Sequence, residues 1–398
     1  MRLRRIIRAA LSVLLLIVVV LGITAGGLWW YFHPRLEPLT RVTYTQRHGH
    51  ELTFDIVRPR RPNGVGIAVM VSGSWKSGPD GFRVWMVAPL LRRGYTIFAV
   101  SHLSQPEATV MEIVEDVNRS VRFIRYHAKE YGIDPNRIGV AGGSAGGHLS
   151  LMLATCGGPG TPDANDPVDR ESSAVQAAAV FFPVTDLLNL GHSTENPGDG
   201  GPPKSFVKAF GPRATDRAAW QEIGRTTSPI YHVTKQLPPV LIFHGDADTL
   251  VPLEQSEWFV TRARDAGGTV KLVVRHGKPH GWLTMIWDIR QFGAWFDRYL
   301  RPSRAPDTTH PSARARAASR VLWHPQAFLR AGRRFFSRVG TVGLRCVYKT
   351  LLGGSSLAQY CPTGAAGGIT GNPGCAEGAG LLPGCLVPID TAPDTSLI

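Results

Sequence analysis

The chain has 398 residues, 43% of them hydrophobic, and is long enough to bury one large core or two smaller ones. Its formal net charge of +14 is typical of nucleic-acid-binding proteins, but the excess of arginine lies near the two ends and the middle is only mildly basic. The charge therefore gives no reason to expect a nucleic-acid partner. No spacing of histidine, cysteine or carboxylate residues is typical of a metal site, and we expect neither a metal nor a cofactor.

The N-terminal region has the pattern of a membrane anchor. Residues 1–8 are rich in arginine, and residues 9–32 contain no charged side chain. As a helix rising about 1.5 Å per residue, this run would be roughly 36 Å long, enough to cross a hydrocarbon core of about 30 Å. Trp29 and Trp30 at its far end are typical of the membrane interface. The pattern predicts a single-pass signal-anchor with a cytoplasmic N-terminus and an exported body; a signal peptide cleaved near Ala25, leaving a secreted protein, is the alternative.

Residues 42–301 alternate between short apolar runs and amphipathic stretches. In residues 110–131, apolar side chains recur at helical spacing. The runs that predict strands are residues 42–57 (a hairpin), 66–71, 95–100, 138–141, 175–182, 240–243 and 270–274. Strands separated by helices predict an α/β fold with a mostly parallel sheet and helices on both faces. We therefore expect functional side chains just beyond the carboxyl ends of the strands.

The sharpest motif follows the strand predicted at residues 138–141. Residues 142–146 read Gly-Gly-Ser-Ala-Gly, and a helix-forming stretch follows, which fits the G-x-S-x-G nucleophile elbow. Glycines flank such a serine because the turn between strand and helix is too tight for side chains. The pattern predicts Ser144 as a nucleophile, with the backbone amide of Ala145 at the helix N-terminus as an oxyanion donor. A glycine-rich turn with an incidental serine is the alternative, which the strand and helix context disfavours.

Two later predicted strands are followed by aspartate and histidine residues that could assist a serine nucleophile. Asp246 and Asp248 follow the strand at residues 240–243, and His276 and His280 follow the strand at residues 270–274. A serine nucleophile needs a histidine base, and the base needs a carboxylate to fix its tautomer. The order serine, aspartate, histidine is that of α/β-hydrolase triads. His244, in the turn motif after its strand, is a third candidate histidine, for which we expect a structural role.

Taken together, these motifs resemble the α/β-hydrolase-fold serine esterases of the hormone-sensitive-lipase and carbohydrate-esterase-like group. Residues 142–149, the His-Gly-x-x-Asp run from His244 to Asp248, and His280-Gly281 carry the resemblance, which covers residues 42–301. It implies a catalytic triad of Ser144, Asp248 and His280, because the second carboxylate is the catalytic one in this family pattern. Asp246 then becomes a loop residue that caps backbone amides.

The chain departs from this group at the expected oxyanion hole. Lipase-like members carry His-Gly-Gly-Gly-Trp after the third strand, whereas this chain has Ser72-Gly73-Ser74-Trp75. Because the donors are backbone amides, Gly73 or Ser74 is expected to serve together with Ala145. The Ser72 hydroxyl can still brace the loop. Trp75 and Trp282 are candidate substrate-binding residues, although a plain core position fits Trp75 equally well.

Residues 183–237 form a polar insert with few large apolar side chains, expected to cap the site. Such a cap favours water-soluble substrates, so the expected function is a serine carboxylesterase acting on short-chain, carbohydrate or aryl esters. A serine peptidase of the oligopeptidase type has the same triad order and is the alternative. An inactive hydrolase-fold binding protein is a weaker one, because all three triad positions are filled.

Residues 302–398 differ in composition from the body of the chain. They are first rich in arginine and then rich in glycine and proline, which predicts a disordered tail, and an out-of-frame extension is an alternative origin. If this tail folds outside the cytoplasm, its four cysteines can form two disulfides with three possible connectivities. The sequence predicts no particular oligomeric state.

Overall fold

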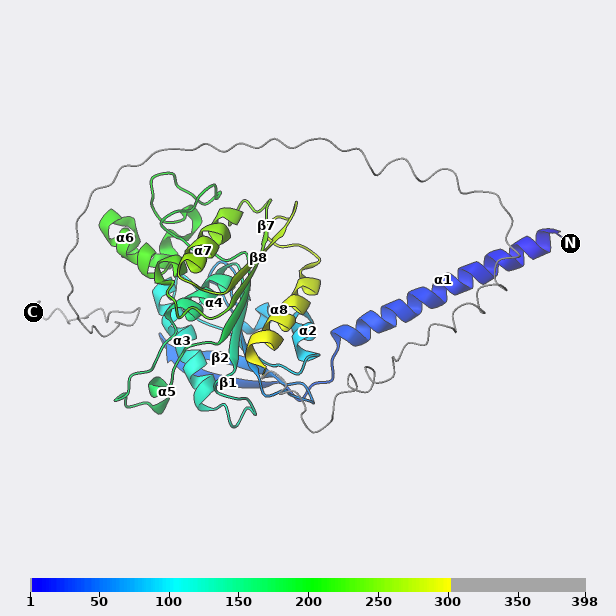
Figure 1. Ribbon diagram of the computed structural model, residues 1–398, viewed down its shortest axis with the longest axis horizontal. Coiled ribbons are helices and arrows are strands. Elements are labelled where there is room, and N and C mark those ends of the chain that lie inside the picture. Colours follow the sequence, from blue (N-terminus) through cyan, green and yellow to red (C-terminus); the bar gives the residue numbers. More distant parts are fainter. Residues whose placement is uncertain (1, 302–398) are drawn as a thin grey trace, which may run out of the picture. The chain divides into compact units, whose positions relative to one another are not determined.

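The computed structural model describes residues 2–301, and the predictions for residues 302–398, including their disulfides, lie outside the described residues. One eight-stranded sheet organises the part that follows the N-terminal helix (Figure 1). Its strands are β1 (Thr40–Arg47), β2 (His50–Val57), β3 (Gly66–Met70), β4 (Thr96–Val100), β5 (Ile138–Gly143), β6 (Ala177–Phe181), β7 (Val240–Gly245) and β8 (Val270–Arg275). Their order across the sheet is β1-β2-β4-β3-β5-β6-β7-β8.

Only the hairpin side of the sheet is antiparallel. β1 pairs with β2 and β2 with β4 in antiparallel fashion, while every pair from β4 to β8 is parallel. The hairpin turns at His48 and Gly49, both with positive φ, as in the two-residue turns that match strand twist. The predicted α/β class with a mostly parallel sheet is confirmed. Because β3 to β8 are parallel, their carboxyl ends lie along one edge, where the loops carrying the candidate residues begin.

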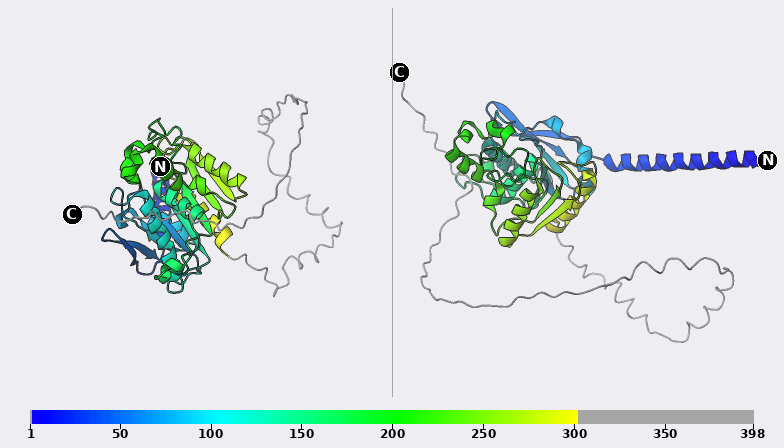
Figure 2. Two further views of the ribbon diagram at one scale, coloured as in Figure 1. Left: turned by 90° about the vertical axis from the view of Figure 1, so that its left-hand side faces the viewer. Right: turned by 90° about the horizontal axis from the view of Figure 1, so that it is seen from above.

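Helices cover both faces of the sheet (Figure 1 and Figure 2). The helices are α1 (Arg2–Phe32), α2 (Ala88–Leu91), α3 (Val110–Tyr126), α4 (Ala145–Cys156), α5 (Pro167–Arg170), α6 (Arg217–Thr226), α7 (Leu253–Asp265) and α8 (Met285–Leu300). Side chains of α3, α4 and α7 share one buried cluster with strand residues that point to the same face, such as Met70 and Val140. Side chains of α2 and α8 share a second cluster with residues of the opposite face, such as Ile67 and Phe243. The alternation along each strand thus separates two cores.

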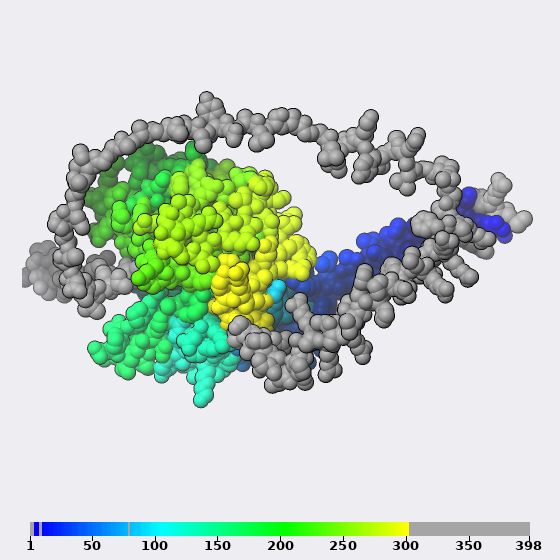
Figure 3. Space-filling model, viewed as in Figure 1, coloured from blue at the N-terminus to red at the C-terminus, as the bar shows by residue number. Residues whose placement is uncertain are grey.

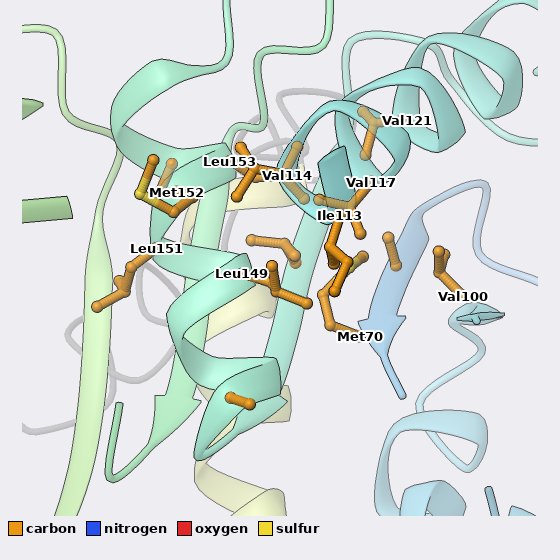
Figure 4. Packing of buried hydrophobic residues seen from close by; sticks show 14 of the residues in the cluster. Met70, Val100, Ile113, Val114, Val117, Val121, Leu149, Leu151, Met152 and Leu153 are labelled. Carbon is orange, nitrogen blue, oxygen red and sulfur yellow. The ribbon is translucent and has the colours of Figure 1, made fainter. Parts of the chain in front are cut away.

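In the core on the α3 and α4 side, the apolar residues that recur at helical spacing in the sequence are buried. Ile113 and Val117 of α3 and Leu149 of α4 are fully buried, and they pack beside Met70 of β3 (Figure 4). α3 begins at a capping box in which the Thr109 hydroxyl accepts from the Glu112 amide and the Glu112 carboxylate accepts from the Thr109 amide. These contacts hold α4, and with it the turn that precedes it, against the sheet.

In the other core, α8 packs beside α2 and a 3₁₀ turn, η2 (Val84–Val87), and α8 also forms part of the surface that Figure 3 shows in yellow. The insert of residues 183–237 contains the short helical segments η3 (Lys204–Phe210), η4 (Pro212–Thr215), α6 and η5 (Pro229–His232). Trp220 of α6 is 1% exposed and packs on Phe210, so the insert has a small core of its own continuous with the α4 side.

The N-terminal helix α1 has the length and composition of a membrane span. Within the described chain, residues 4–32 are the one stretch that meets this criterion, with a mean hydropathy of 2.9 and no residue of the most apolar window buried. A signal sequence meets the same criterion, so the anchor remains a prediction.

Candidate active site

Ser144 lies at the turn between β5 and α4, in a backbone conformation that side chains rarely adopt. Its φ and ψ are 54° and −122°. A Cβ atom on Gly142 would stand 2.3 Å from the carbonyl oxygen of Gly146, and a Cβ on Gly146 would stand 2.5 Å from that of Met70. Glycine is therefore required at both positions because backbone approaches backbone there. The turn lifts the Ser144 hydroxyl above the carboxyl end of β5.

The structure brings the three residues of the expected triad into one hydrogen-bonded series. His280 Nε2 lies 2.9 Å from Ser144 Oγ, and His280 Nδ1 lies 2.7 Å from Asp248 Oδ2. Because an ionised carboxylate only accepts, Nδ1 carries the proton and Nε2 presents its lone pair to the Ser144 hydroxyl. The geometry is that of a nucleophile, a base and a carboxylate that orients the base.

Asp248 is enclosed by donors at the end of β7. Its Oδ1 accepts from the amides of Leu250 and Val251, each at 3.0 Å, and its side chain is fully buried. Burial by itself would raise the pKa of Asp248, but hydrogen bonds from His244 and His280 outweigh it and lower the pKa to about 2. Asp248 is therefore ionised throughout the neutral range.

His244 has the structural role that the sequence predicts for it. Its ring is 0% exposed, with Nδ1 accepting from the Ser256 hydroxyl at 2.7 Å and Nε2 donating to the Val251 carbonyl at 2.7 Å. This tautomer directs the N–H of Nε2 toward Asp248 Oδ2, 3.5 Å away. His244 thus holds the Asp248 loop and adds a donor beside its carboxylate.

The rival residues Asp246 and His276 form a separate pair. His276 Nδ1 lies 2.7 Å from Asp246 Oδ2, and the amide of Gly277 donates to Asp246 Oδ1 at 2.6 Å. The His276 side chain is 87% exposed. Asp246 therefore caps the loop as the sequence suggests, and this pair makes no hydrogen bond with Ser144.

The loop expected to form the oxyanion hole is a tight turn. The amide of Gly73 donates to the Lys76 carbonyl at 3.0 Å, and Ser74 and Trp75 have positive φ values of 53° and 54°. The Gly73 amide is therefore engaged within the turn, which corrects the expectation that it serves as an oxyanion donor. The Ser74 amide takes no part in the two hydrogen bonds between Gly73 and Lys76. Ala145 is the first residue of α4, so its amide has no acceptor within the helix.

A hydrogen bond between half-buried Ser72 and buried His102 braces this loop, a contact that the sequence did not reveal. His102 Nε2 lies 2.8 Å from the Ser72 hydroxyl, and His102 Nδ1 donates to the Leu103 carbonyl at 2.8 Å. Burial lowers the pKa of His102 to about 4, so the ring is neutral and accepts the Ser72 proton. Ser72 thus braces the loop as predicted, with His102 after β4 as its partner.

Trp75 joins the same loop to α4 from inside the core. Its Nε1 donates to His148 Nδ1 at 3.2 Å, His148 Nε2 donates to the Thr227 carbonyl at 2.6 Å, and the indole packs on Phe206 and Phe210. Trp75 is 3% exposed and does not line the cavity that Ser144 borders, which corrects the expectation of a substrate-binding role in favour of the core position. Burial lowers the pKa of His148 to about 4, so this ring too is neutral.

A cavity of about 890 Å³ opens above Ser144. Its walls are mostly apolar and come from residues 69–90 and 282–292 as well as from β5 and β6. The large apolar members include Phe82, Met86, Phe181, Trp282, Ile286 and Phe292. Trp282, the other candidate substrate-binding residue, lies in the cavity wall, and its Nε1 donates to Asp288 Oδ2 at 2.8 Å.

The insert of residues 183–237 contributes no residue to the walls of this cavity. It packs instead against Trp75 and α4, on the far side of the Ser144 loop. We expected water-soluble substrates because a polar insert would cover the site. The insert does not line the cavity, so its polarity gives no reason to expect such substrates. Among residues 2–301, no group of three histidine, cysteine or carboxylate side chains is placed to hold a metal ion.

Comparison with known proteins identifies relatives of this chain and of its fold. A family model described as BD-FAE matches residues 54–262, just over half of the chain. The chain is 30% identical over 193 residues to the probable carboxylic ester hydrolase LipM and 31% identical over 231 residues to the esterase LipQ, both of Mycobacterium tuberculosis. The matches cover 48% and 55% of this chain and 43% and 51% of the relatives. The chain thus spans about half the length of these curated relatives.

Solved structures agree on the fold. An acetyl ester-xyloside bifunctional hydrolase from Caldicellulosiruptor lactoaceticus has a TM-score of 0.55 at 23% identity, over 67% of this chain and 97% of that one. An esterase from Thermogutta terrifontis, Est2, has a TM-score of 0.53 at 26% identity, over 67% and 95% of the two chains. The sheet and helices described above therefore form an α/β-hydrolase fold.

The close approach at the elbow predicts a position-specific effect of alanine. We expect Gly146→Ala to lower the free energy of unfolding by about 1–3 kcal/mol, because its methyl group meets the Met70 carbonyl. Gly158→Ala is the matched control, since its Cβ would have one neighbour, at 3.9 Å. Urea unfolding of the detergent-solubilised chain measures both. Equal stability of the two variants would contradict the requirement for glycine at the elbow.

The neutral His148 predicts a pH dependence of stability. Its pKa is about 4 in the folded chain and about 6.5 when unfolded, so between these values the unfolded chain binds the extra proton. The free energy of unfolding should therefore fall as the pH is lowered from 6.5 to 4, by up to about 1.4 kcal/mol per pH unit from this residue. Urea unfolding at several pH values should give a shallower dependence for His148→Gln than for the natural chain. Identical slopes would show that His148 is protonated alike in both states.

Proposed function

Because the chain belongs to the BD-FAE family of α/β hydrolases, we propose that it is a serine esterase that hydrolyses carboxylic esters through an acyl-enzyme intermediate. The observation that carries this proposal is the hydrogen-bonded series from Ser144 through His280 to Asp248 at the carboxyl edge of the sheet. The names of the curated relatives, which are esterases and ester hydrolases, support the same chemistry.

In the acylation step, Ser144 Oγ attacks the ester carbonyl carbon while its proton passes to His280 Nε2. The carbonyl oxygen becomes an oxyanion, for which the amides of Ala145 and Ser74 are the proposed donors. As the tetrahedral intermediate collapses, the bond to the alkoxy oxygen breaks and His280 returns the proton to the leaving alcohol. The acyl group is then bonded to Ser144 Oγ.

In the deacylation step, water replaces the alcohol. His280 Nε2 takes a proton from the water, whose oxygen attacks the acyl carbon, and the same proton then returns to Ser144 Oγ as the acid leaves. Asp248, ionised because its pKa is about 2, keeps Nδ1 protonated and stabilises the imidazolium in both steps. The neutral rings of His102 and His148 hold the oxyanion loop and α4 without adding charge near the site.

We also propose that α1 remains attached and anchors the chain in a membrane as a single span, with the catalytic part outside the cytoplasm. The apolar helix, the arginines that precede it and the tryptophan pair at its end support this placement. A catalytic domain of residues 42–301 then follows the anchor after a short connection.

Covalent labelling of the detergent-solubilised full chain with a fluorophosphonate tests the nucleophile and base. Ser144→Ala and His280→Ala should lose labelling, because the first removes the attacking oxygen and the second removes its base. His276→Ala is the matched control, since His276 is exposed and makes no bond to Ser144. Labelling that persists in Ser144→Ala would contradict the assignment of the nucleophile.

Kinetics with p-nitrophenyl butyrate test the carboxylate. Asp248→Asn should lower kcat by roughly 10³–10⁴-fold, since the amide can donate to Nδ1 and hold the wrong tautomer. Asp246→Asn should stay within a few-fold of the natural chain, because Asp246 contacts only the outer loop. If Asp246→Asn has the larger effect, the triad acid is assigned to the wrong carboxylate.

Alkaline carbonate washing of membranes from expressing cells tests the anchor. We expect the full chain to stay in the membrane pellet, because a span of residues 4–32 resists extraction at high pH. N-terminal sequencing of the mature protein should begin before residue 25. Release into the wash, or a mature N-terminus near residue 26, would establish the cleaved signal peptide instead.

A further inference from the structure

Large apolar side chains are exposed where the cavity opens. Trp85, Met86 and Leu283 line the cavity and are 49%, 41% and 99% exposed, and Trp287, beside them on α8, is 40% exposed. We call these four residues the apolar rim. Single exposed apolar residues need no explanation, but a group gathered at the mouth of one cavity marks a surface that meets an apolar partner.

The last turn of α1 packs on this apolar rim. The Phe32 ring lies 6.5 Å from Trp85 and 5.6 Å from Trp287, and the Tyr31 ring lies 6.1 Å from Trp287, between ring centroids. If α1 spans a membrane, the apolar rim therefore lies where the span emerges. Aromatic side chains are enriched at that depth in membrane proteins.

Arg92 fixes the end of α1 to the body of the chain. Its guanidinium donates to the backbone carbonyls of Trp30 and Tyr31, and it lies 3.8 Å from the centroid of the Trp30 ring. The carbonyls in the last turn of a helix lack partners within the helix, so an arginine is a favourable cap there. This contact ties the orientation of the catalytic part to the direction of the span.

Beside this junction lies a groove whose composition suits the headgroup layer. It has a volume of about 830 Å³ and lies between the end of α1 and the loops before β3 and β4. Its lining includes Trp29, Trp30, Arg35, Arg60, Arg61 and Arg92, and no carboxylate. Tryptophan and arginine together are typical of protein surfaces that meet anionic lipid headgroups. The groove and the apolar rim both border α1 where it ends, and independently indicate the same surface.

The cavity connects the apolar rim to the predicted nucleophile. The exposed side chains of Trp85 and Leu283 line the same cavity as Ser144. Its walls are mostly apolar, with Phe82, Ile286 and Phe292 among the side chains. A hydrocarbon chain that passes from a bilayer into this cavity moves from one apolar environment to another.

We propose that the cavity opens onto the membrane surface and that the substrate is an amphiphilic ester whose acyl chain lies in the bilayer. This inference rests on the proposed serine esterase function and names its substrate class. The acyl chain enters past the apolar rim, the ester carbonyl reaches Ser144 Oγ, and the alcohol portion stays at the headgroup layer.

The test uses the full chain reconstituted in phosphatidylcholine–phosphatidylglycerol vesicles with two esters. One ester, p-nitrophenyl butyrate, is dissolved in the buffer, and the other, 4-methylumbelliferyl oleate, is held in the vesicles. The variant is Trp287→Glu, which places a carboxylate on the apolar rim outside the cavity wall. The matched control is Tyr126→Glu, because Tyr126 is 45% exposed and belongs to α3 on the opposite face of the sheet.

We expect the natural chain to hydrolyse both esters. Trp287→Glu should lower the rate on the vesicle-borne ester about fivefold or more, because it removes an interfacial aromatic side chain and adds a charge that anionic lipid repels. Its rate on the dissolved ester should stay within about twofold of the natural rate, which also shows that the variant folds. Tyr126→Glu should change neither rate by more than about twofold.

Two other outcomes overturn the inference in distinguishable ways. If the natural chain hydrolyses the dissolved ester alone, or if both variants affect the vesicle-borne ester equally, the membrane-facing cavity is wrong while the serine esterase function stands. If neither ester is hydrolysed and a fluorophosphonate does not label Ser144, the proposed function itself fails and the inference fails with it.

Discussion

The site depends on the close approach of backbone to backbone where β5 turns into α4. Gly146 lies so near the Met70 carbonyl that no side chain fits, and Gly142 is confined in the same way by Gly146. This packing holds Ser144 in a strained conformation, with a φ of 54°, that an isolated turn would not retain. The buried side chains of α4 maintain the approach, because they fix the helix against β3 and β5. The position of the hydroxyl therefore follows from the core beneath it.

Buried histidines stabilise the loops around Ser144 in three separate places. His102 holds the loop after β3 through Ser72, His148 joins that loop to the insert, and His244 holds the loop that carries Asp248. Each ring donates through one nitrogen to a backbone carbonyl and contacts a second segment through the other nitrogen, and the lowered pKa values of His102 and His148 keep those two rings neutral. Within the hydrogen-bonded series that reaches Ser144, the ionised side chain is Asp248, which acts through His280. In the proposed reaction, the Asp248 carboxylate stabilises the positive charge of the His280 imidazolium that forms during proton transfer.

The walls of the cavity proposed to hold the substrate come from other segments than the proposed catalytic residues. The strand ends of the parallel sheet supply Ser144, Asp248 and His280, whereas the cavity walls come chiefly from residues 69–90 and 282–292. These two segments meet because α2 and α8 pack together on one face of the sheet. The same face receives the end of α1, so the proposed anchor and the cavity mouth adjoin without any contribution from the insert of residues 183–237.

The sequence alone determined the α/β class and the elbow around Ser144, because both depend on local patterns: apolar runs of strand length, helical spacing, and glycines where backbones touch. It also placed the candidate carboxylates and histidines at strand ends, but by themselves these residues left two pairs open. The resemblance to known esterases favoured Asp248 and His280, and the tertiary structure places this pair beside Ser144 and the pair of Asp246 and His276 on the surface.

Contacts between distant segments decided the rest. The Gly73 amide donates to the Lys76 carbonyl, and Trp75 is buried against His148. The apolar walls of the cavity come from residues 69–90 and 282–292, and not from the insert of residues 183–237. No local pattern records which side chains meet across a sheet, since this depends on how helices pack on its faces.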